Sequence, residues 1–461
     1  MDAHTRLPVT RVDTLVQAIA RTIDSGACPP GSRLPSIRQQ ARQSGVSPFT
    51  VVEAYERLVA LGLVLSRRGS GFFVQTKIPH TPPLNADPTD LPLDEHWLLR
   101  NVYNQPDNCL PAGCGWLPGQ WYDLGTQHRV MRTLARDAMI QAEYGDPSGY
   151  RPLRRHLALS LCERDIPATE KEILLTQGAS SALNSVTATL ARPGETLFVD
   201  DPGYCNLLSS LTFHGFNVVG VPWTPHGPDT KALEALLKQH RPKAYFTNPW
   251  LQNPTGASFS TNTAHQVLKL AEQYDFQLVE DNVSGELLDP PPPALAAMDG
   301  LSRVIYIGSF SKSLSPGLRV GFIAAKHELI EKLVRYKMMS GLTTPELNER
   351  ITLGMLQESH YRKQMDRLRD HLAKAQYHAA RGFDRLGWRL FTRPQNGLFL
   401  LAHPPGNVDS LELARQARQE NILLAPGKLF RPYGIDTPWL RFNVAYCNDN
   451  TLWSFLERAT T

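Results

Sequence analysis

Apolar residues recur at helical spacing within the first 75 residues of the chain. Leu15, Ile19 and Ile23 form one such stripe and predict a first helix. Ser36 and Ser47 each precede a further helical segment, where a serine side chain accepts a hydrogen bond from the first helical turn. The pattern therefore predicts three short helices, of which the third begins immediately after Ser47.

A β-hairpin is predicted after the third helix. Two short apolar runs, residues 63–65 and 72–74, flank a basic loop with two glycines at residues 67–71. Three helices followed by such a hairpin are typical of a winged helix-turn-helix, in which the helix after Ser47 enters the major groove of DNA. The alternative is a small helical surface domain with solvated arginines.

The charge distribution favours an anionic partner for this segment alone. Residues 1–75 contain nine arginines, no lysine and five acidic residues, so their formal charge of +4 equals that of the whole chain. Such asymmetry indicates double-stranded DNA as the partner. We expect contacts with phosphates or bases from Arg33, Ser36, Arg38, Ser47, Phe49, Thr50, Arg67, Arg68 and Gly69.

Lys312 is the most informative residue of the remaining chain. It follows the strand-like run 304–307 and lies between Ser311 and Ser313, with Arg319 seven residues later. An amine surrounded by hydroxyl and guanidinium donors suits an aldehyde that carries a phosphate, and pyridoxal 5′-phosphate (PLP) is such a molecule. A surface lysine beside a turn is the ordinary alternative, and three further motifs count against it.

Two of these motifs follow predicted strands, at the sheet edge where α/β folds bind ligands. Asp281 ends the run 276–280, and its carboxylate can pair with a protonated pyridine nitrogen. Asn253 comes after the run 243–247, and its amide can donate to the phenolate oxygen of PLP.

The third motif is a seat for phosphate. Ala179 and Ser180 precede a helix predicted over residues 181–190, and backbone N–H groups at a helix start bind anions. Tyr204 is placed to stack on the cofactor ring.

Together these motifs resemble the fold-type I PLP-dependent aminotransferases from residue 98 to the C-terminus. The resemblance implies an α/β domain with a mostly parallel sheet, a smaller C-terminal α/β subdomain, and PLP bound to Lys312 as a Schiff base. It also implies that Arg441 binds a substrate or effector carboxylate. Tyr144 matches a tyrosine that reaches the phosphate of a neighbouring subunit, which implies a homodimer. The implied cofactor site comprises Tyr144, Ala179, Ser180, Tyr204, Asn253, Asp281, Ser309, Ser311, Lys312 and Arg319.

One departure from that family counts against catalysis. Its enzymes carry a tyrosine two or three residues beyond the aspartate, where the phenol donates to O3′ of PLP. Here Asp281 is followed by Asn282, Val283 and Ser284, and a serine is too short to replace a phenol. We therefore expect PLP to bind while transamination is weak or absent.

The first 75 residues resemble the GntR family of bacterial regulators, on the motif that runs from Arg33 to Ser36 and the spacing from there to Ser47. Five prolines without apolar periodicity follow and predict an extended linker. This order resembles the MocR subfamily of GntR regulators, in its YdcR-type branch. The implied boundaries are a DNA-binding domain at 1–75, a linker at 76–95 and an aminotransferase-like domain at 96–461.

Two functions remain open at this stage. The first is a transcriptional regulator that responds to PLP or to a small amino compound, and the second is a working aminotransferase with an accessory DNA-binding domain. A third possibility, a pure dimerisation scaffold, conflicts with the retained PLP motifs. The six cysteines lack metal-ligand spacing and no apolar run reaches the length of a membrane span, so we expect a cytoplasmic protein with no metal site and no membrane partner.

Overall fold

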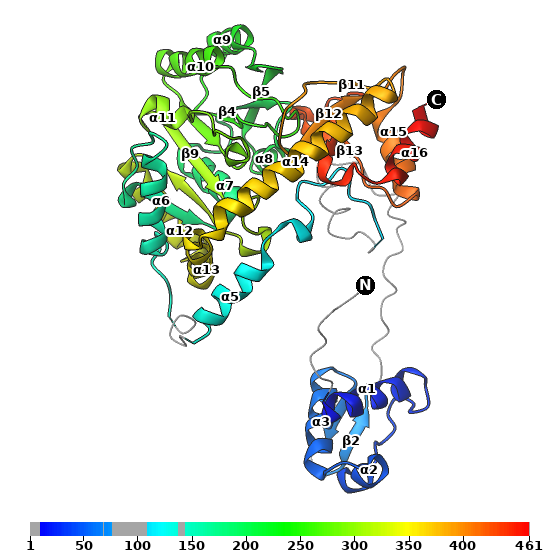
Figure 1. Cartoon of the computed structure of the whole chain (residues 1–461). Helices are drawn as coiled ribbons and strands as arrows, with labels where there is room; N and C mark the ends of the chain where they lie inside the picture. Colours follow the sequence, from blue (N-terminus) through cyan, green and yellow to red (C-terminus); the bar gives the residue numbers. More distant parts are fainter. Residues whose placement is uncertain (1–9, 68, 76–107, 137–142, 461) are drawn as a thin grey trace. The chain divides into compact units, whose positions relative to one another are not determined.

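The computed structural model describes residues 10–67, 69–75, 108–136 and 143–460 of the chain. The chain divides into two compact units, residues 1–87 and 88–461 (Figure 1). The predicted linker at 76–95 lies outside the described residues, so the domain boundaries at 75 and 95 stay predictions.

The N-terminal unit contains the three helices and the hairpin that the sequence predicts. Both serine caps form: Ser36 Oγ accepts from the Gln39 N–H at 3.3 Å, and Ser47 Oγ accepts from the Thr50 N–H at 3.1 Å. The elements are α1 (Arg11–Asp24), α2 (Ile37–Ser44), α3 (Pro48–Ala60), β1 (Val64–Arg67) and β2 (Gly71–Val74).

The core of this unit lies on one face of α3. Val51, Tyr55 and Leu58 are fully buried on that face, as their helical spacing predicts. The Tyr55 hydroxyl donates to the Pro35 carbonyl at 2.9 Å, and its ring packs edge-on against Phe72 of β2. Tyr55 thus contacts both the residues before α2 and the hairpin, and holds them to α3.

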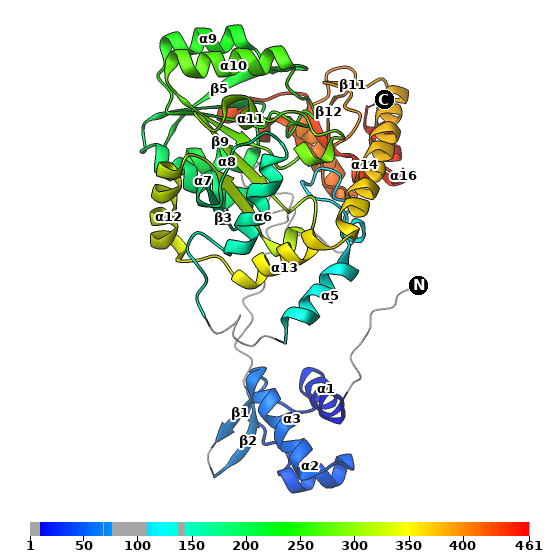
Figure 2. The ribbon, with the colours of Figure 1, turned by 60° about the vertical axis from the view of Figure 1, so that its left-hand side comes forward.

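The second unit is built on an eight-stranded sheet in the order β3-β10-β9-β8-β7-β4-β5-β6. Figure 2 shows strands β3, β5 and β9 of this sheet among the helices of the second unit. Five neighbouring strands from β9 to β5 are parallel, whereas β10 is antiparallel to both of its neighbours and β6 to β5. The strands are β3 (Ile173–Thr176), β4 (Thr196–Asp201), β5 (Asn217–Thr224), β6 (Gly227–Pro228), β7 (Ala244–Thr247), β8 (Gln277–Asp281), β9 (Val304–Ser309) and β10 (Gly321–Ala324).

Helices cover both faces of this sheet because alternate strand residues point to opposite sides. Tyr245 packs into one core with α6, α9, α10, α11 and α13, and Phe246 packs into the other with α7, α8 and α12. The helices are α5 (Leu124–Leu134), α6 (Arg151–Cys162), α7 (Gly178–Leu190), α8 (Cys205–Phe213), α9 (Thr230–Gln239), α10 (Thr261–Tyr274), α11 (Leu295–Asp299), α12 (His327–Gly341) and α13 (Glu346–Gln357).

A smaller C-terminal subdomain completes the second unit, as the sequence predicts. Its antiparallel sheet has the order β11-β12-β14-β13 and shares one core with the long helix α14 and with residues 112–122. Its elements are α14 (His360–Arg385), β11 (Arg389–Leu390), β12 (Phe399–His403), α15 (Ser410–Gln419), β13 (Ala425–Pro426), β14 (Leu440–Asn443) and α16 (Asn450–Thr460).

Neither a membrane-spanning helix nor a metal-binding cluster occurs among the described residues. No helix there is both long and apolar enough to cross a membrane. The same residues contain no group of three or more histidine, cysteine, aspartate or glutamate side chains arranged to hold a metal ion.

Candidate functional site

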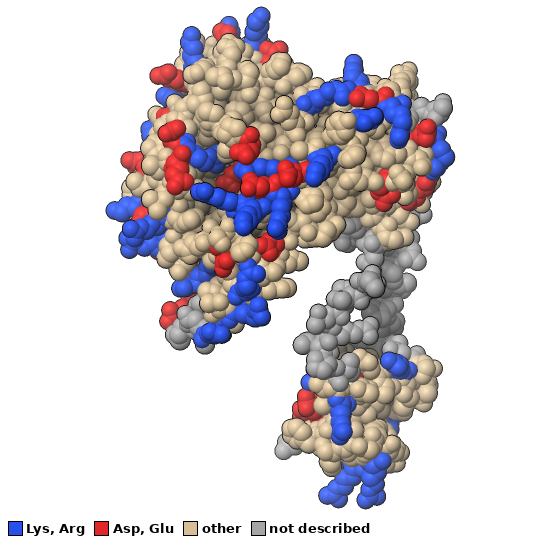
Figure 3. All heavy atoms as spheres, viewed as in Figure 1, with Lys and Arg blue, Asp and Glu red and all other residues tan. Residues whose placement is uncertain are grey.

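The candidate DNA-binding residues of the N-terminal unit lie at its surface. Phe49, in the first turn of α3, is 77% exposed, and Arg33, Arg38 and Arg67 are exposed as well. On the face shown in Figure 3, basic side chains gather at the end of this unit that carries α2. Arg68 lies outside the described residues, so its predicted role in the hairpin loop remains a prediction.

Two predicted DNA contacts, Ser36 and Ser47, already have a structural task. Both side chains are engaged as helix caps, and Ser47 Oγ also lies 2.9 Å from Thr50 Oγ1. Neither serine is buried, and Gly69 in the hairpin loop is exposed. The first role of the two serines is to set where α2 and α3 begin.

Two arginines flank the hairpin. A side chain at Gly71 would come within 3.2 Å of the Arg33 guanidinium, so Arg33 lies directly against β2. The Arg67 guanidinium lies 4.8 Å from the ring centre of Phe73. The hairpin therefore presents positive charge that is held in place by packing.

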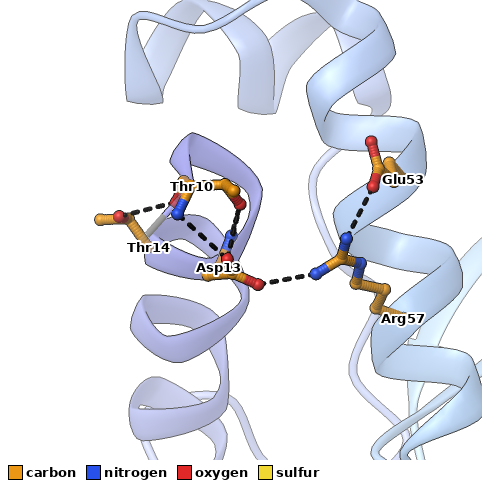
Figure 4. A network of polar contacts seen from close by, with 5 residues as sticks. All are labelled: Thr10, Asp13, Thr14, Glu53 and Arg57. Atoms are coloured by element: carbon orange, nitrogen blue, oxygen red, sulfur yellow. Dashed lines mark hydrogen bonds and ion pairs between the residues drawn. The ribbon is translucent and has the colours of Figure 1, made fainter. Parts of the chain in front are cut away.

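Arg57 on α3 links this helix to α1 (Figure 4). Its guanidinium contacts Asp13 of α1 at 2.6 Å and Glu53 at 2.8 Å. Hydrogen bonds from Thr10, and the charge of Arg57, hold the pKa of Asp13 below its usual range. Arg57 is thus committed to holding α1 against α3.

Lys312 and Asp281 lie at the carboxyl ends of β9 and β8, beside each other in the parallel part of the large sheet. Lys312 Nζ donates to the Gly115 carbonyl. Burial lowers the pKa of Lys312 to about 8 and raises the pKa of Asp281 to about 7. Asp281 Oδ1 is buried without a hydrogen-bond partner among the described residues, so the site holds a carboxyl oxygen that lacks a donor.

A hydrogen-bonded network supports Asp281 from the neighbouring strands. Asn248 Nδ2 donates to the Asp281 carbonyl at 2.5 Å, and Asn248 Oδ1 accepts from the Asn253 N–H at 2.9 Å. The carboxylate of Asp200 accepts from the Asn248 N–H at 3.0 Å, and burial raises the pKa of Asp200 to about 6. Asn248 was not predicted, although it follows β7 directly, as Asp281 ends β8.

The anion seat forms where β3 meets α7. The helix begins at Gly178, three residues earlier than predicted, because the positive φ of Gly178 (77°) turns the chain directly out of the strand. Ala179 and Ser180 therefore lie in the first turn. The Arg319 guanidinium donates to the Gln177 carbonyl at 3.1 Å, and a side chain at 178 would come within 2.8 Å of it.

Ser309, Ser311 and Tyr204 are further predicted cofactor residues that the structure describes. Ser309 Oγ donates to Ser311 Oγ at 3.1 Å, directly before Lys312. Tyr204 and Ser180 line one cavity of about 320 Å³. Burial raises the pKa of Tyr204 to about 12, and its hydroxyl accepts from Asn206 at 3.0 Å.

Arg441 is the most confined charge of the site, at 2% exposure. Its guanidinium lies between the rings of Phe399 and Phe430, 4.6 and 4.5 Å from their centres. It donates to Asn253 Oδ1 at 2.8 Å and to the Gly113 carbonyl at 2.6 Å, while Nε has no partner within the described part of the chain. The side chain thus retains N–H donors for a carboxylate.

Two predictions about phenols have different outcomes. Tyr144 is 85% exposed, so its predicted contact with the phosphate of a neighbouring subunit stays a prediction. The sequence offers no phenol directly after Asp281, but the Tyr122 hydroxyl, which was not predicted at the site, donates to the Ser311 carbonyl at 3.1 Å. Only the fold brings Tyr122, 190 residues before Lys312 in the chain, to this loop.

These residues fit PLP. Asp281 offers an unpaired carboxyl oxygen for the pyridine nitrogen, and the start of α7 with Arg319 offers donors for the phosphate. Lys312 supplies an amine whose pKa is lowered toward neutrality, which increases the fraction of free amine.

The family assignments agree with this geometry. The sequence profile of "Aminotransferase class I and II" matches residues 119–458, and that of "Bacterial regulatory proteins, gntR family" matches residues 11–74. The chain belongs to the GntR-type regulators with an aminotransferase-like domain. These are the MocR-type regulators, and the cofactor of the large domain is pyridoxal 5′-phosphate.

Individual relatives show the same two-part similarity. The "Uncharacterized HTH-type transcriptional regulator YdcR" of Escherichia coli (strain K12) is 29% identical, over 96% of this chain and 95% of the relative. The 2-aminoadipate transaminase of Thermus thermophilus is 32% identical, over 68% of this chain and 79% of the relative. The structure of LysN, the α-aminoadipate aminotransferase of Thermus thermophilus, superposes with a TM-score of 0.72 at 26% identity, covering 79% of this chain and 94% of that one.

Proposed function

We propose that this MocR-type regulator binds double-stranded DNA through its N-terminal unit and changes its DNA affinity when PLP, and then an amino compound with a carboxylate, binds its aminotransferase-like domain. One observation carries the proposal: the half-buried Lys312 and the buried Asp281 and Arg441 belong to a chain whose excess positive charge is confined to a winged helix-turn-helix.

Each residue of the proposed PLP site has a distinct role. Lys312 holds PLP covalently, Asp281 pairs with the pyridine nitrogen, and Arg319 with the first turn of α7 binds the phosphate. Tyr204 stacks on the ring. Bound PLP supplies an electron sink and a carbon that amines attack.

Arg441 selects the second ligand. Its position between two phenyl rings excludes water, and a guanidinium with unused donors binds a carboxylate in a bidentate manner. We therefore infer an effector that carries both an amine, to react at the cofactor, and a carboxylate, to bind Arg441.

Weak or absent turnover separates this proposal from the second candidate, a working aminotransferase with an accessory DNA-binding unit. The residues after Asp281 provide no phenol, and the Tyr122 hydroxyl is already engaged with a carbonyl. The second candidate is favoured by the retained Arg441 and by the similarity to transaminases.

The experiment that separates the two candidates uses the full chain loaded with PLP. A panel of amino acids, each with a keto acid, is tested for turnover and for its effect on the affinity for a DNA duplex selected by the protein from a random pool. We expect at least one amino acid to change DNA affinity while turnover stays far below about 1 per second. Steady turnover near that rate, with DNA affinity unaffected, would establish the second candidate instead.

We also propose a homodimer in which Tyr144 completes the partner's PLP site. The support is the 85% exposure of Tyr144, which leaves its phenol at the surface where a second chain can reach it, whereas Lys312, Asp281 and Tyr204 are buried or half-buried. Mixing Tyr144→Phe chains with Lys312→Ala chains tests this, because a mixed dimer then contains one site with both residues intact. Tighter PLP binding in the mixture than in either variant alone supports shared sites, and no gain from mixing contradicts them.

The proposed contacts with DNA follow the surface of the N-terminal unit. Phe49 and Thr50 at the start of α3 read bases, Arg33, Arg38 and the hairpin arginines bind phosphates, and Ser36 and Ser47 act mainly through the helix starts that they cap.

A further inference from the structure

One segment beside the proposed PLP site has no role in the function proposed above. Residues 110–116, which we call the strap, precede α5 and pack on the C-terminal subdomain. The Leu110 N–H donates to the Asn421 carbonyl at 2.8 Å, and the Gly113 N–H donates to the Leu423 carbonyl at 2.6 Å. Gly113 approaches residues 424 and 425 so closely that a side chain there would overlap their backbone.

The strap supplies carbonyl partners to both cations of the site. The Gly113 carbonyl accepts from Arg441 at 2.6 Å, and the Gly115 carbonyl accepts from Lys312. Because both cations are removed from water, these carbonyls offset part of their desolvation. The strap is thus hydrogen-bonded to the two side chains that the proposed ligands would bind.

A third side chain fixes the strap between those two contacts. Asn443 Nδ2 donates to the Cys114 carbonyl at 3.2 Å and to the Trp116 carbonyl at 2.7 Å, and the Asn443 N–H donates to the Ala112 carbonyl at 2.7 Å. Asn443 follows Arg441 by two residues on β14, so the strap and the carboxylate-binding arginine share one strand as their support.

Ligands of the site need the same two cations. Once Lys312 holds the cofactor, its amine no longer offers three N–H donors, so the Gly115 carbonyl loses that partner. A carboxylate on Arg441 shares the guanidinium with the Gly113 carbonyl. Occupation of the site therefore weakens or redistributes the hydrogen bonds that hold the strap.

We propose that the strap is the element that couples occupancy of the PLP site to DNA binding. The strap lies closer in sequence to the N-terminal unit than any residue predicted to bind PLP. A change in its attachment therefore reaches the DNA-binding unit along the shortest stretch of chain. This inference rests on the proposed function, because it names the route by which the same site acts on DNA.

The test compares two glycine substitutions. A Cβ at position 113 would lie 2.5 Å from backbone atoms of residues 424 and 425, so Gly113→Ala must displace the strap. A Cβ at Gly119, just beyond the strap, meets no atom within 4 Å, which makes Gly119→Ala a matched control. For each full-length variant, the dissociation constant for the selected duplex is measured with and without saturating PLP.

We expect PLP to change the DNA affinity of the unsubstituted protein and of Gly119→Ala by the same factor, about fivefold or more. Gly113→Ala should still bind PLP and DNA but respond by less than about twofold. A full response from a PLP-loaded Gly113→Ala protein overturns the inference. If neither PLP nor any amino acid then added changes the DNA affinity of the unsubstituted protein, the proposed function itself fails.

A second variant covers the case in which Gly113→Ala loses PLP. Asn443→Asp keeps the oxygen that accepts from the Ala445 N–H but removes the donor to the Cys114 and Trp116 carbonyls. We expect the same loss of response, with PLP binding verified by its absorbance. An undiminished response from this variant contradicts the role of the strap.

Discussion

In the N-terminal unit the candidate functional side chains lie at the surface, whereas in the second unit Arg441 and Asp281 are buried and Lys312 is half-buried. Phe49 is 77% exposed, and the arginines proposed to bind DNA are exposed. Arg441 is 2% exposed, and burial shifts the pKa of both Lys312 and Asp281 toward neutrality. A surface site binds by the number and placement of its charges, and a buried site binds by the groups that it leaves unpaired.

The sharpest way to break this comparison is to remove the buried amine. Lys312→Ala should abolish covalent attachment of PLP, because the sequence from Asp281 to Arg319 contains no second lysine. Borohydride reduction of the PLP-loaded protein followed by peptide mapping should find the pyridoxyl group on Lys312 and none in the variant. A pyridoxyl group found on another lysine would show that Lys312 is not the residue that binds PLP. DNA binding in the absence of PLP should survive, because the N-terminal unit has a core of its own.

The next largest effect concerns pH. PLP requires an ionised Asp281 to pair with its protonated nitrogen and a neutral Lys312 amine to react. Since the pKa of Asp281 is raised to about 7 and that of Lys312 is lowered to about 8, both requirements are met increasingly as pH rises. PLP affinity should therefore increase between about pH 6 and pH 9, by about tenfold or more.

The variant Asp281→Asn sharpens that measurement. It removes the carboxyl that titrates near pH 7, so affinity should be lower at high pH and the remaining rise should be centred nearer pH 8. An unchanged pH profile would mean that Asp281 does not face the pyridine nitrogen. Absorbance titration of PLP at several pH values measures both quantities.

Substitution of the residues proposed to contact bases, Phe49 and Thr50, should have a smaller effect, on sequence preference. Phe49→Ala or Thr50→Ala is expected to narrow the gap in affinity between selected and random duplex by about 1–3 kcal/mol for each lost base contact. Phe49 has no core to fill, so protein stability should change little. Gel-shift titrations with both duplexes measure the gap. Equal loss on both would show that α3 does not read sequence.

Loss of a phosphate contact should lower the affinity for every DNA sequence by the same factor. Arg38→Ala is expected to weaken binding to selected and random duplex alike and to lower the salt slope by about one unit. Arg57→Ala is the matched control in the same unit, because Arg57 is engaged with Asp13 and Glu53. It should lower the thermal midpoint slightly and leave the salt slope unchanged. A reduced salt slope in Arg57→Ala would mean that Arg57 contacts a phosphate, and the proposed orientation of α1 and α3 on DNA would be wrong.

Local features of the chain were predictable from the sequence, and long-range ones were not. The caps at Ser36 and Ser47 and the ends of β8 and β9 depend on neighbouring residues, so spacing and residue type suffice to find them. The start of α7 was predicted three residues late, because the positive φ of Gly178 begins the helix directly after the strand, and the guanidinium of the distant Arg319 leaves no room for a side chain there.

The strap and Tyr122 illustrate the other case. Gly113 meets Arg441 across 328 residues, and Tyr122 meets the loop before Lys312 across 189 residues. No periodicity or motif connects such positions, since their contact depends on how the C-terminal subdomain closes on the large sheet. Asn248 was not predicted, although its position directly after β7 is a local feature from which its place at the edge of the sheet could have been predicted.

The contact between Gly113 and Arg441 also has a consequence for protein synthesis. The N-terminal unit is complete once roughly the first 75 residues have left the ribosome, but the PLP site needs residue 441. At ordinary translation rates, that interval lasts about 20 to 70 seconds. During it the nascent chain contains a DNA-binding unit but lacks the site that we propose to control it. A truncated chain that lacks residue 441 would therefore bind DNA whether or not PLP is present.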